Sequence, residues 1–231
     1  MGNVGSGKSL SAVRTIYERK QETFCNFAVK LPNVIRLKRS HIIAEEVTNT
    51  LRTGKEVKQK SVNWQFWNAF VKQHQGFDMV IDELHNVAHS RMAMTKNNVL
   101  FTMWFSQIRK LLGTSERNHI ILISQKLSRI DVAFRDLVDT VVYCRKIELP
   151  YSMKTLVRSN GRLVEKDIPL TLIVQYTFTG EMAVENYYVF RDNPGMARKC
   201  RLYKKSWFVA NTYFQYYDSY EIIDFGDDSY L

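Results

Sequence analysis

The sequence predicts an α/β fold in which a mainly parallel sheet is flanked by helices and followed by a β-rich C-terminal extension. Three observations predict it. A glycine-rich segment at residues 2–9 leads into a helical pattern, apolar runs at residues 77–83 and 119–125 end in polar side chains, and strand patterns dominate from Val141 onward. Strands that alternate with helices are typical of parallel sheets.

Residues 2–9 match the phosphate-binding P-loop pattern G-x-x-x-x-G-K-[ST]. In such a loop the glycines let backbone N–H groups point at phosphates, the lysine adds charge at the β- and γ-phosphates, and the serine hydroxyl binds Mg²⁺. We expect Lys8 to act in catalysis as well as binding, and Ser9 to be a metal ligand. The residues predicted to bind a nucleoside triphosphate are Gly2, Asn3, Val4, Gly5, Ser6, Gly7, Lys8, Ser9 and Leu10.

The residues after the loop favour this interpretation over a disordered glycine- and serine-rich tail. Leu10, Val13, Ile16 and Tyr17 fall at helical spacing and predict the amphipathic helix that a P-loop requires. A P-loop normally follows a strand, whereas this one begins at the second residue. The first strand is therefore expected to be missing, because the chain begins inside a longer protein or its start codon is misassigned. The loop would then be held only through its helix and its ligand.

A second part of a nucleotide site is expected at the end of a buried strand, where a carboxylate holds Mg²⁺. Residues 77–83 fit, since a mostly apolar run ends in Asp82 and Glu83. We expect Asp82 to bind the magnesium ion and Glu83 to orient or deprotonate the attacking water. An Asp-Glu pair can also complement a helix N-terminus, but its occurrence together with a P-loop favours the metal site.

Two histidines after this strand raise the alternative of a zinc site. His85 and His89 are four residues apart, which on a helix places both on one face. In the H-E-x-x-H motif the glutamate directly follows the first histidine, whereas Glu83 precedes His85. The order disfavours zinc, and the histidines are expected to line a segment near the nucleotide.

Other elements of the first half follow from spacing and breakers. Residues 23–29 predict a strand, residues 40–51 a helix with Ser40 as N-cap, and residues 52–61 a basic loop. The aromatic side chains of residues 62–71 are spaced as in a helix, which favours a buried helix face over stacking on bases.

A helix and a strand are predicted to complete the parallel part. Residues 101–112 carry an apolar stripe of helical period that ends at Gly113. Residues 119–125 then form an apolar strand that finishes in Ser124 and Gln125. Because open parallel sheets bind ligands at the carboxyl ends of their strands, these side chains are expected beside the two carboxylates. Gln125 would sense the γ-phosphate or position water; alternatively, its amide caps the next loop.

The last third reads as strands and turns. Asn160 and Gly161 between two apolar-polar runs predict a tight hairpin turn. We place a P-loop core, truncated at its N-terminal end, at residues 1–146 and a β-rich extension with an acidic C-terminal end at residues 147–231. The strands predicted in this region are residues 140–147, 170–178 and 187–190.

The composition favours a polyanionic partner. The formal net charge is +10, which favours nucleic acid; a solvated surface or acidic lipids are the alternatives. No apolar run reaches the length of a membrane span, and the three cysteines lack the spacing of a metal site or disulfide framework. We expect a soluble protein located in the cytoplasm.

Together these motifs resemble the zonula-occludens-toxin-like ATPases. The resemblance rests on the P-loop, residues 80–83, Arg109, residues 121–125 and residues 130–135, and it covers residues 2–146. These proteins are similar to filamentous-phage assembly proteins and belong to the FtsK/HerA group of translocases. The resemblance implies a core that binds ATP and Mg²⁺, forms a ring, commonly a hexamer, and drives DNA in virus packaging, extrusion or cell division.

The resemblance also implies site residues and partners. It places Gln125 and the segment up to Arg135 beside the nucleotide, and Arg135 is a candidate arginine finger on these grounds. Arg109 is a second candidate, because it lies on the polar face of the helix before the glutamine strand. Each arginine could instead contact solvent or DNA. Other virion or assembly proteins are possible partners, and the further finger candidates are Arg117 and Arg129.

The leading hypothesis is thus a DNA-translocating ATPase, with the lack of a membrane anchor favouring a packaging motor over membrane-bound extrusion. Two alternatives stay open. One is a small-molecule phosphotransferase of the kinase type, with the aromatic and basic residues 52–75 as a lid over the acceptor. The other is a non-catalytic, nucleotide-gated assembly scaffold at a membrane.

Overall fold

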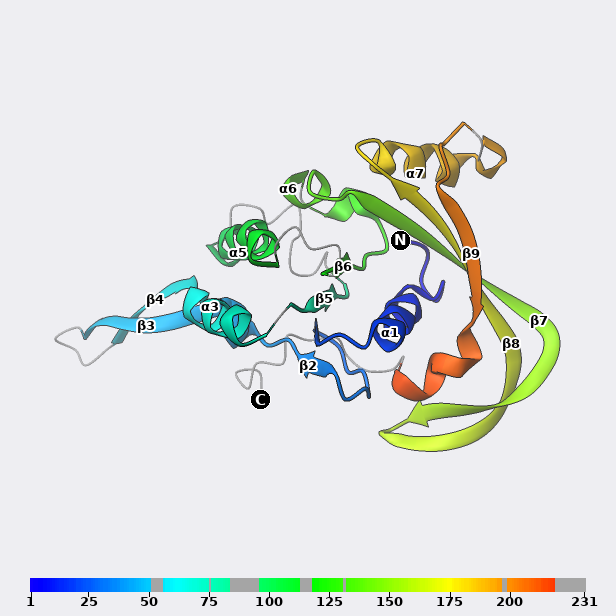
Figure 1. Ribbon diagram of the computed structural model, residues 1–231, viewed down its shortest axis with the longest axis horizontal. Helices are drawn as coiled ribbons and strands as arrows, with labels where there is room; N and C mark the ends of the chain where they lie inside the picture. The colour runs from blue at the N-terminus through cyan, green and yellow to red at the C-terminus, as the bar shows by residue number, and fades with distance from the viewer. Residues whose placement is uncertain are drawn as a thin grey trace.

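The chain forms two main sheets with a helix between them (Figure 1). The computed structural model describes residues 1–50, 56–74, 76–83, 96–112, 118–130, 132–196 and 199–218. No helix in these ranges is long and apolar enough to span a membrane. The helices are α1 (Lys8–Arg19), α2 (Arg39–Ile42), α3 (Trp64–Gln73), α5 (Lys96–Leu112), α6 (Val132–Arg135) and α7 (Ala183–Asp192), with 3₁₀ turns η2 (Leu127–Arg129), η3 (Pro194–Met196) and η4 (Ala210–Tyr216). The strands are β1 (Thr23–Cys25), β2 (Val34–Arg36), β3 (Ile43–Thr50), β4 (Glu56–Val62), β5 (Asp78–Ile81), β6 (Ile120–Leu122), β7 (Thr140–Ser159), β8 (Arg162–Thr179) and β9 (Lys204–Val209).

The first sheet is four-stranded and parallel, with strand order β2-β1-β5-β6. Successive residues of the inner strand β5 face opposite sides of it. Met79 and Ile81 belong to the core that includes α3 and α5, whereas Val80 packs with Val13 and Ile16 of α1. A parallel sheet covered by helices on both faces is the predicted α/β fold, which is therefore confirmed.

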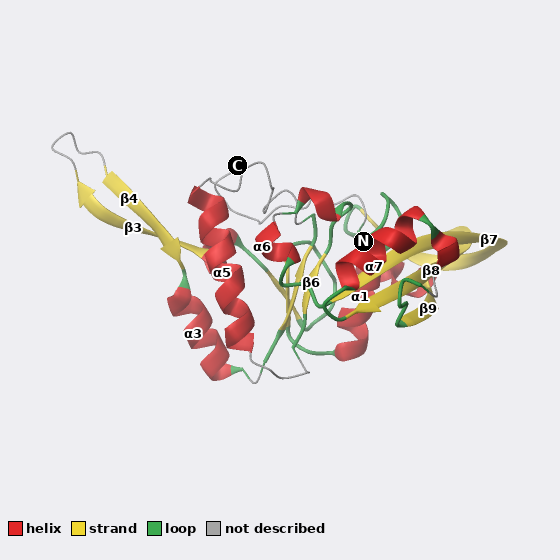
Figure 2. Cartoon of the chain, turned by 90° about the horizontal axis from the view of Figure 1, so that it is seen from above, coloured by secondary structure: helices red, strands yellow, loops and turns green. Residues whose placement is uncertain are grey.

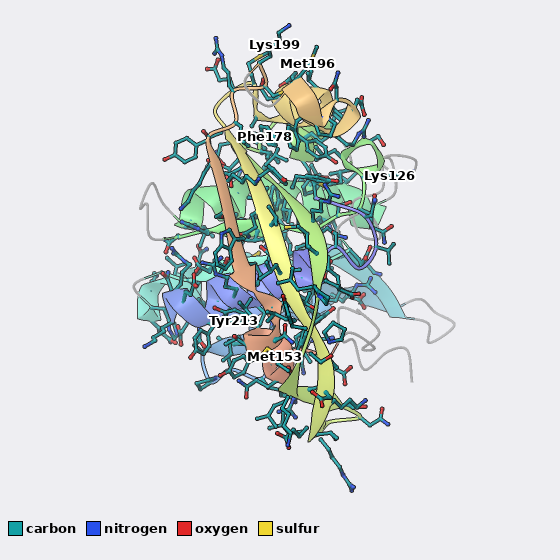
Figure 3. All side chains as sticks on the ribbon, turned by 90° about the vertical axis from the view of Figure 1, so that its right-hand side faces the viewer. Lys126, Met153, Phe178, Met196, Lys199 and Tyr213 are labelled. Carbon is teal, nitrogen blue, oxygen red and sulfur yellow. The ribbon has the colours of Figure 1, made fainter. Side chains whose placement is uncertain are left out.

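The second sheet is antiparallel, with strand order β7-β8-β9. It curves around the side of α1 that faces away from the first sheet (Figure 1), and Figure 3 views it face on. The turn between β7 and β8 has positive φ angles at Asn160 (48°) and Gly161 (77°), as a type I′ turn requires. The predicted hairpin and β-rich extension are therefore confirmed.

A hairpin of β3 and β4 extends away from the body of the molecule (Figures 1 and 2). The helix predicted over residues 40–51 is wrong, because α2 ends at Ile42 and β3 follows directly. The N-cap of this short helix is Lys38 rather than Ser40. Backbone pairing with β4 supplies the hydrogen bonds here, and such pairing overrides local helix propensity.

The basic loop predicted over residues 52–61 is wrong in its second half. Strand β4 begins at Glu56, and residues 51–55 lie outside the described residues. The sequence of β4 does not indicate a strand, because its apolar residues, Val57 and Val62, are five positions apart and produce no alternation. Its register is nevertheless regular at the base, where Ile43 pairs with Val62.

The strand predicted over residues 187–190 is also wrong, because these residues lie in α7. Ala183, Tyr187 and Phe190 are its buried residues, and their spacing of four and three positions is helical. A short apolar run cannot distinguish a strand from a helix segment by itself. The first predicted strand, residues 23–29, is present in shorter form as β1.

The aromatic segment around residues 62–71 forms a helix with a buried face, as predicted. In α3, Trp67 is fully buried, and its ring lies 5.1 Å from Phe24, 5.5 Å from Phe77 and 5.8 Å from Trp104 between centroids. Offset and edge-to-face packing of this kind adds to the stability from buried area. Trp67 therefore joins the parallel sheet to α5.

Replacing Trp67 with alanine is expected to lower the free energy of unfolding by about 3–5 kcal/mol, because the cavity cannot be filled by rigid neighbouring rings. Urea denaturation followed by circular dichroism measures the change. Trp207→Ala is the matched control, because Trp207 on β9 is 64% exposed, and it should cost less than about 0.5 kcal/mol. Equal losses in the two variants would contradict the assignment of the core.

Candidate functional site

The glycine-rich loop at residues 2–7 has a backbone that only glycine adopts easily. Gly5 and Gly7 have φ angles of 69° and 87°, in the left-handed region. Gly7 is the N-cap of α1, and a Cβ atom there would lie 2.8 Å from Ile173 Cγ1 of β8. The second sheet therefore fixes the start of α1 as closely as the loop itself does.

The N-terminal end of the loop is joined to β7. The amino group of Met1 donates a hydrogen bond to Val142 O (2.7 Å), and Cys144 N donates to Met1 O (2.8 Å). Gly2 lies so close to this strand that a Cβ atom would be 2.6 Å from Cys144 O. The expectation that the loop is held only through its helix and its ligand is therefore wrong, because backbone hydrogen bonds to β7 hold its other end.

The lysine of the loop folds back over it. Lys8 Nζ donates hydrogen bonds to Gly2 O (3.0 Å) and Asn3 O (2.8 Å). Burial lowers the pKa of the Lys8 ammonium, and the carboxylates of Asp82 and Glu83 oppose this shift. The cation is thus held at the loop by carbonyl oxygens and by two nearby negative charges.

Ser9 and Asp82, the two predicted metal ligands, are in direct contact. The Ser9 hydroxyl donates to Asp82 Oδ2, although the two residues are far apart in the sequence. Asp82 is buried, and burial raises the pKa of its carboxyl group; the hydrogen bonds from Ser9 and from Glu83 N oppose the shift. Both side chains offer the oxygen donors that Mg²⁺ prefers.

Glu83 lies next to Gln125, as the sequence predicts for the ends of adjacent strands. Gln125 Nε2 donates to Glu83 Oε1 at 3.3 Å, and β5 and β6 are neighbours in the sheet. Ser124 is buried, and its hydroxyl donates to Lys126 O. Glu83 has a φ angle of 51°, which is uncommon for a residue with a side chain and is found preferentially at functional sites.

Asn26 is a member of the site that sequence reasoning missed. It follows β1 and is buried; its Nδ2 donates to Asp82 O (2.9 Å), and its Oδ1 accepts from Asp82 N (2.7 Å). The two bonds fix the backbone of Asp82 from the neighbouring strand. The signal that identified Ser124 and Gln125, a polar side chain just after a buried strand, also applies to Asn26.

Arg135 is the one predicted arginine whose side chain the structure describes. Arg135 is half-buried on α6, and its Nε is buried without a hydrogen-bond partner in the described part of the chain. Arg109 lies within α5, but its side chain is outside the described residues, as is that of Arg129. Arg117, His85 and His89 also lie outside the described residues.

The side chain of Ser6, in the loop, carries a buried hydroxyl group. Ser6 Oγ is buried and has no hydrogen-bond partner among the described residues. Because buried polar groups normally have partners, this atom indicates a position for a ligand. Together with Lys8, Ser9 and Asp82, it fits a nucleoside triphosphate with Mg²⁺.

The chain is similar to proteins of a known family. A family model described as zonular occludens toxin (Zot) matches residues 1–167 of the chain. The crystal structure of the N-terminal domain of zonular occludens toxin from Neisseria meningitidis is similar over 90% of this chain and 91% of that chain, with 16% sequence identity and a TM-score of 0.43. No curated protein matches the chain.

Replacing Asp82 with asparagine is expected to stabilise the ligand-free protein at neutral pH. The folded pKa of Asp82 is raised, so the burial of its charge has no cost below the unfolded pKa of about 4 and an increasing cost as the pH rises from there through the folded pKa. Asparagine removes that cost. Calorimetry should give a higher Tm for the variant than for the unaltered protein at pH 7, and a smaller difference at pH 4.

Asp139→Asn is the control for this comparison, because Asp139 is exposed. Its Tm should stay within the scatter of the unaltered protein at both pH values. A lower Tm for Asp82→Asn than for the unaltered protein at pH 7 would show that the hydrogen bonds to the carboxylate outweigh its burial.

Proposed function

The chain belongs to the zonular occludens toxin (Zot) family, and on that premise we propose that it is an ATPase that moves DNA during viral genome packaging or during virion assembly and export. The observation that carries the ATPase part is the convergence of Lys8, Ser9, Asp82, Glu83 and Gln125, which come from one loop and two strand ends.

The loop and its lysine would hold the phosphates. Backbone N–H groups and the N-terminus of α1 attract the anion, and Lys8 exchanges its loop carbonyls for phosphate oxygens. Ser9 and Asp82 would hold Mg²⁺, which neutralises charge on the β- and γ-phosphates when it is bound. Asn26 keeps the backbone of Asp82 in place for this task.

Glu83 is the residue that we assign to the attacking water. It directly follows the metal-binding residue, and Gln125 holds its carboxylate from the next strand. A carboxylate in this position can orient the water and accept its proton. Gln125 is thereby a positioning residue, and it can also contact the γ-phosphate.

DNA is the proposed partner because the chain is strongly basic, with a net charge of +10. A described part of this charge lies at and before β9, where Lys199, Arg201 and Lys204 are exposed. Tyr203 (71% exposed) and Trp207 (64% exposed) are interleaved with these cations. Exposed aromatic rings among cations suit a strand of nucleic acid, since they add stacking to charge neutralisation.

A ring of subunits is the proposed assembly, with other virion or assembly proteins as further partners and the host cytoplasm as its location. Transition-state charge on the γ-phosphoryl group calls for a cation beyond Lys8, and ring ATPases take it from a neighbouring subunit. Arg135 is the first candidate for this finger on the grounds of the family resemblance. Arg109 stays the second candidate.

No observation favours the phosphotransferase alternative. The segment considered as its lid contains α3, whose Trp67 is fully buried in the core, so this helix is part of the fixed body. The scaffold alternative makes the opposite prediction about hydrolysis, and the Glu83 variant below separates the two.

Glu83→Gln is expected to bind ATP with unchanged affinity but to hydrolyse it about 10²- to 10⁴-fold more slowly, because the amide cannot accept the proton of the attacking water. Equilibrium binding and steady-state phosphate release measure the two quantities. Glu46→Gln is the matched control on the exposed face of β3 and should retain full activity. Equal hydrolysis by the two variants would remove Glu83 from catalysis and favour a scaffold.

DNA is expected to stimulate ATP hydrolysis, and the logarithm of the DNA binding constant should fall with log salt concentration by about 0.9 for each phosphate contact. Replacing Lys199 and Lys204 together with alanine should reduce that slope by about 2 units if each contacts one phosphate. Lys166→Ala is the control, because Lys166 is an exposed lysine on the β7–β8 hairpin. An unchanged slope in the double variant would refute this surface as the DNA contact.

A further inference from the structure

A cavity lies beside the phosphate-binding loop, on the side of the second sheet. Its volume is about 290 Å³. Residues 3–6 of the loop form one wall, and residues 143–146 of β7 form another. Tyr176 of β8 and Phe190 of α7 contribute to it as well. The parallel sheet supplies none of these lining residues, so the cavity belongs to the junction between the loop and the β-rich extension.

Aromatic rings line the cavity on the side of the second sheet. Tyr176 and Phe190 have ring centroids 4.8 Å apart, and Tyr143 and Tyr176 have centroids 6.1 Å apart. Pro194 extends this apolar lining beyond α7. A wall of adjacent aromatic rings suits a flat, unsaturated ligand such as a heterocyclic base, which gains both apolar burial and ring contacts there.

Polar and basic groups also line the cavity. Arg145 and Lys146 line it and are exposed, so their cations can reach a ligand from the solvent side. Ser6 also lines it, and its buried hydroxyl has no partner among the described residues. These hydrogen-bonding and cationic groups match the hydroxyl groups of a sugar and the phosphate attached to it.

The cavity and the phosphate cradle are two sides of one loop. Cys144 lines the cavity, and its backbone N–H bonds to Met1 O directly before the loop. The volume is just below the range of roughly 300–1,000 Å³ that small-molecule sites span, which suits a base and its ribose rather than a whole nucleoside triphosphate. The phosphates would then continue along the loop to Lys8.

We infer that the base and ribose of the bound nucleoside triphosphate occupy this cavity, so that Tyr143, Tyr176 and Phe190 recognise the nucleoside while the loop binds its phosphates. This inference rests on the proposed function. It assigns part of nucleotide recognition to Tyr176 and Phe190, in the part of the chain that the sequence indicates as an extension. The ligand class is a purine nucleotide, whose two fused rings cover more of the aromatic wall than a pyrimidine does.

Binding of inorganic triphosphate and of ATP, each with Mg²⁺, separates the two halves of the site. The unaltered protein should bind ATP more tightly than triphosphate, and Tyr176→Ala should weaken ATP binding about tenfold while leaving triphosphate binding unchanged. Tyr176→Phe should restore the ATP affinity, because it keeps the ring. Tyr151→Ala is the matched control, since Tyr151 on β7 is 69% exposed and does not line the cavity. It should change neither affinity.

Photolabelling the unaltered protein with 8-azido-ATP gives a measurement that does not depend on a variant that folds. The label on the base should attach to the residues that line the cavity, which are residues 3–6, residues 143–146, Tyr176, Phe190 and Pro194. Attachment elsewhere, or an ATP affinity that Tyr176→Ala leaves unchanged while triphosphate binds normally, would overturn the inference alone. Triphosphate binding that is absent, or insensitive to Lys8→Ala, would instead overturn the proposed function and the inference with it.

Discussion

The packing of α1 between two sheets is the constraint on which the site depends. One side of this helix places Val13 and Ile16 against the parallel sheet, and the other places Leu10 against Ile173 and Phe208 of the second sheet. Polar contacts reinforce the second side, since Gln175 donates to Ser11 Oγ and the Arg14 guanidinium lies 4.7 Å from the centre of the Phe208 ring. The helix therefore cannot shift without disturbing both cores. The loop directly precedes this helix, so its position is fixed as well.

The site contains charged groups that are buried. Asp82 is buried beside Lys8, and its oxygens are compensated by the Ser9 hydroxyl and the Glu83 N–H, while Asn26 satisfies its backbone. A cation bound to the Asp82 carboxylate in place of the Ser9 proton would offset the energetic cost of burying this negative charge. The left-handed backbone of Glu83 is locally strained, and such strain persists where contacts with the surrounding structure hold a residue in place. The groups that prepare the site for a cation therefore lower the stability of the ligand-free protein.

The sequence predicts the parallel core well because its elements are local and buried. The helix after the loop, the strands that end in Asp82 and Gln125 and the type I′ turn all carry signals within a short window. The β3–β4 hairpin and α7 were not predicted because their local signals are weak. The sequence of the hairpin lacks a clear apolar-polar alternation, and the apolar run in α7 is too short to define its period. The aromatic cavity depends on contacts between segments far apart in the chain, which spacing alone does not reveal, whereas Asn26 carries the signal of a polar side chain just after a buried strand.

The second sheet acts on the nucleotide site through direct contacts rather than as an appendage. Position 146, where the sequence analysis ends the core, lies within the continuous strand β7. That strand bonds to Met1, touches Gly2 and lines the cavity beside the loop, while its partner β8 supplies Ile173 against Gly7. Any movement of the loop upon nucleotide binding must therefore be accommodated by β7 and β8. Strand β9, which carries exposed cations and aromatic rings, is paired to β8 along Leu172–Thr177 and therefore neighbours the strand that lies against Gly7. Under the function proposed above, this pairing would connect ATP hydrolysis to the proposed DNA contact.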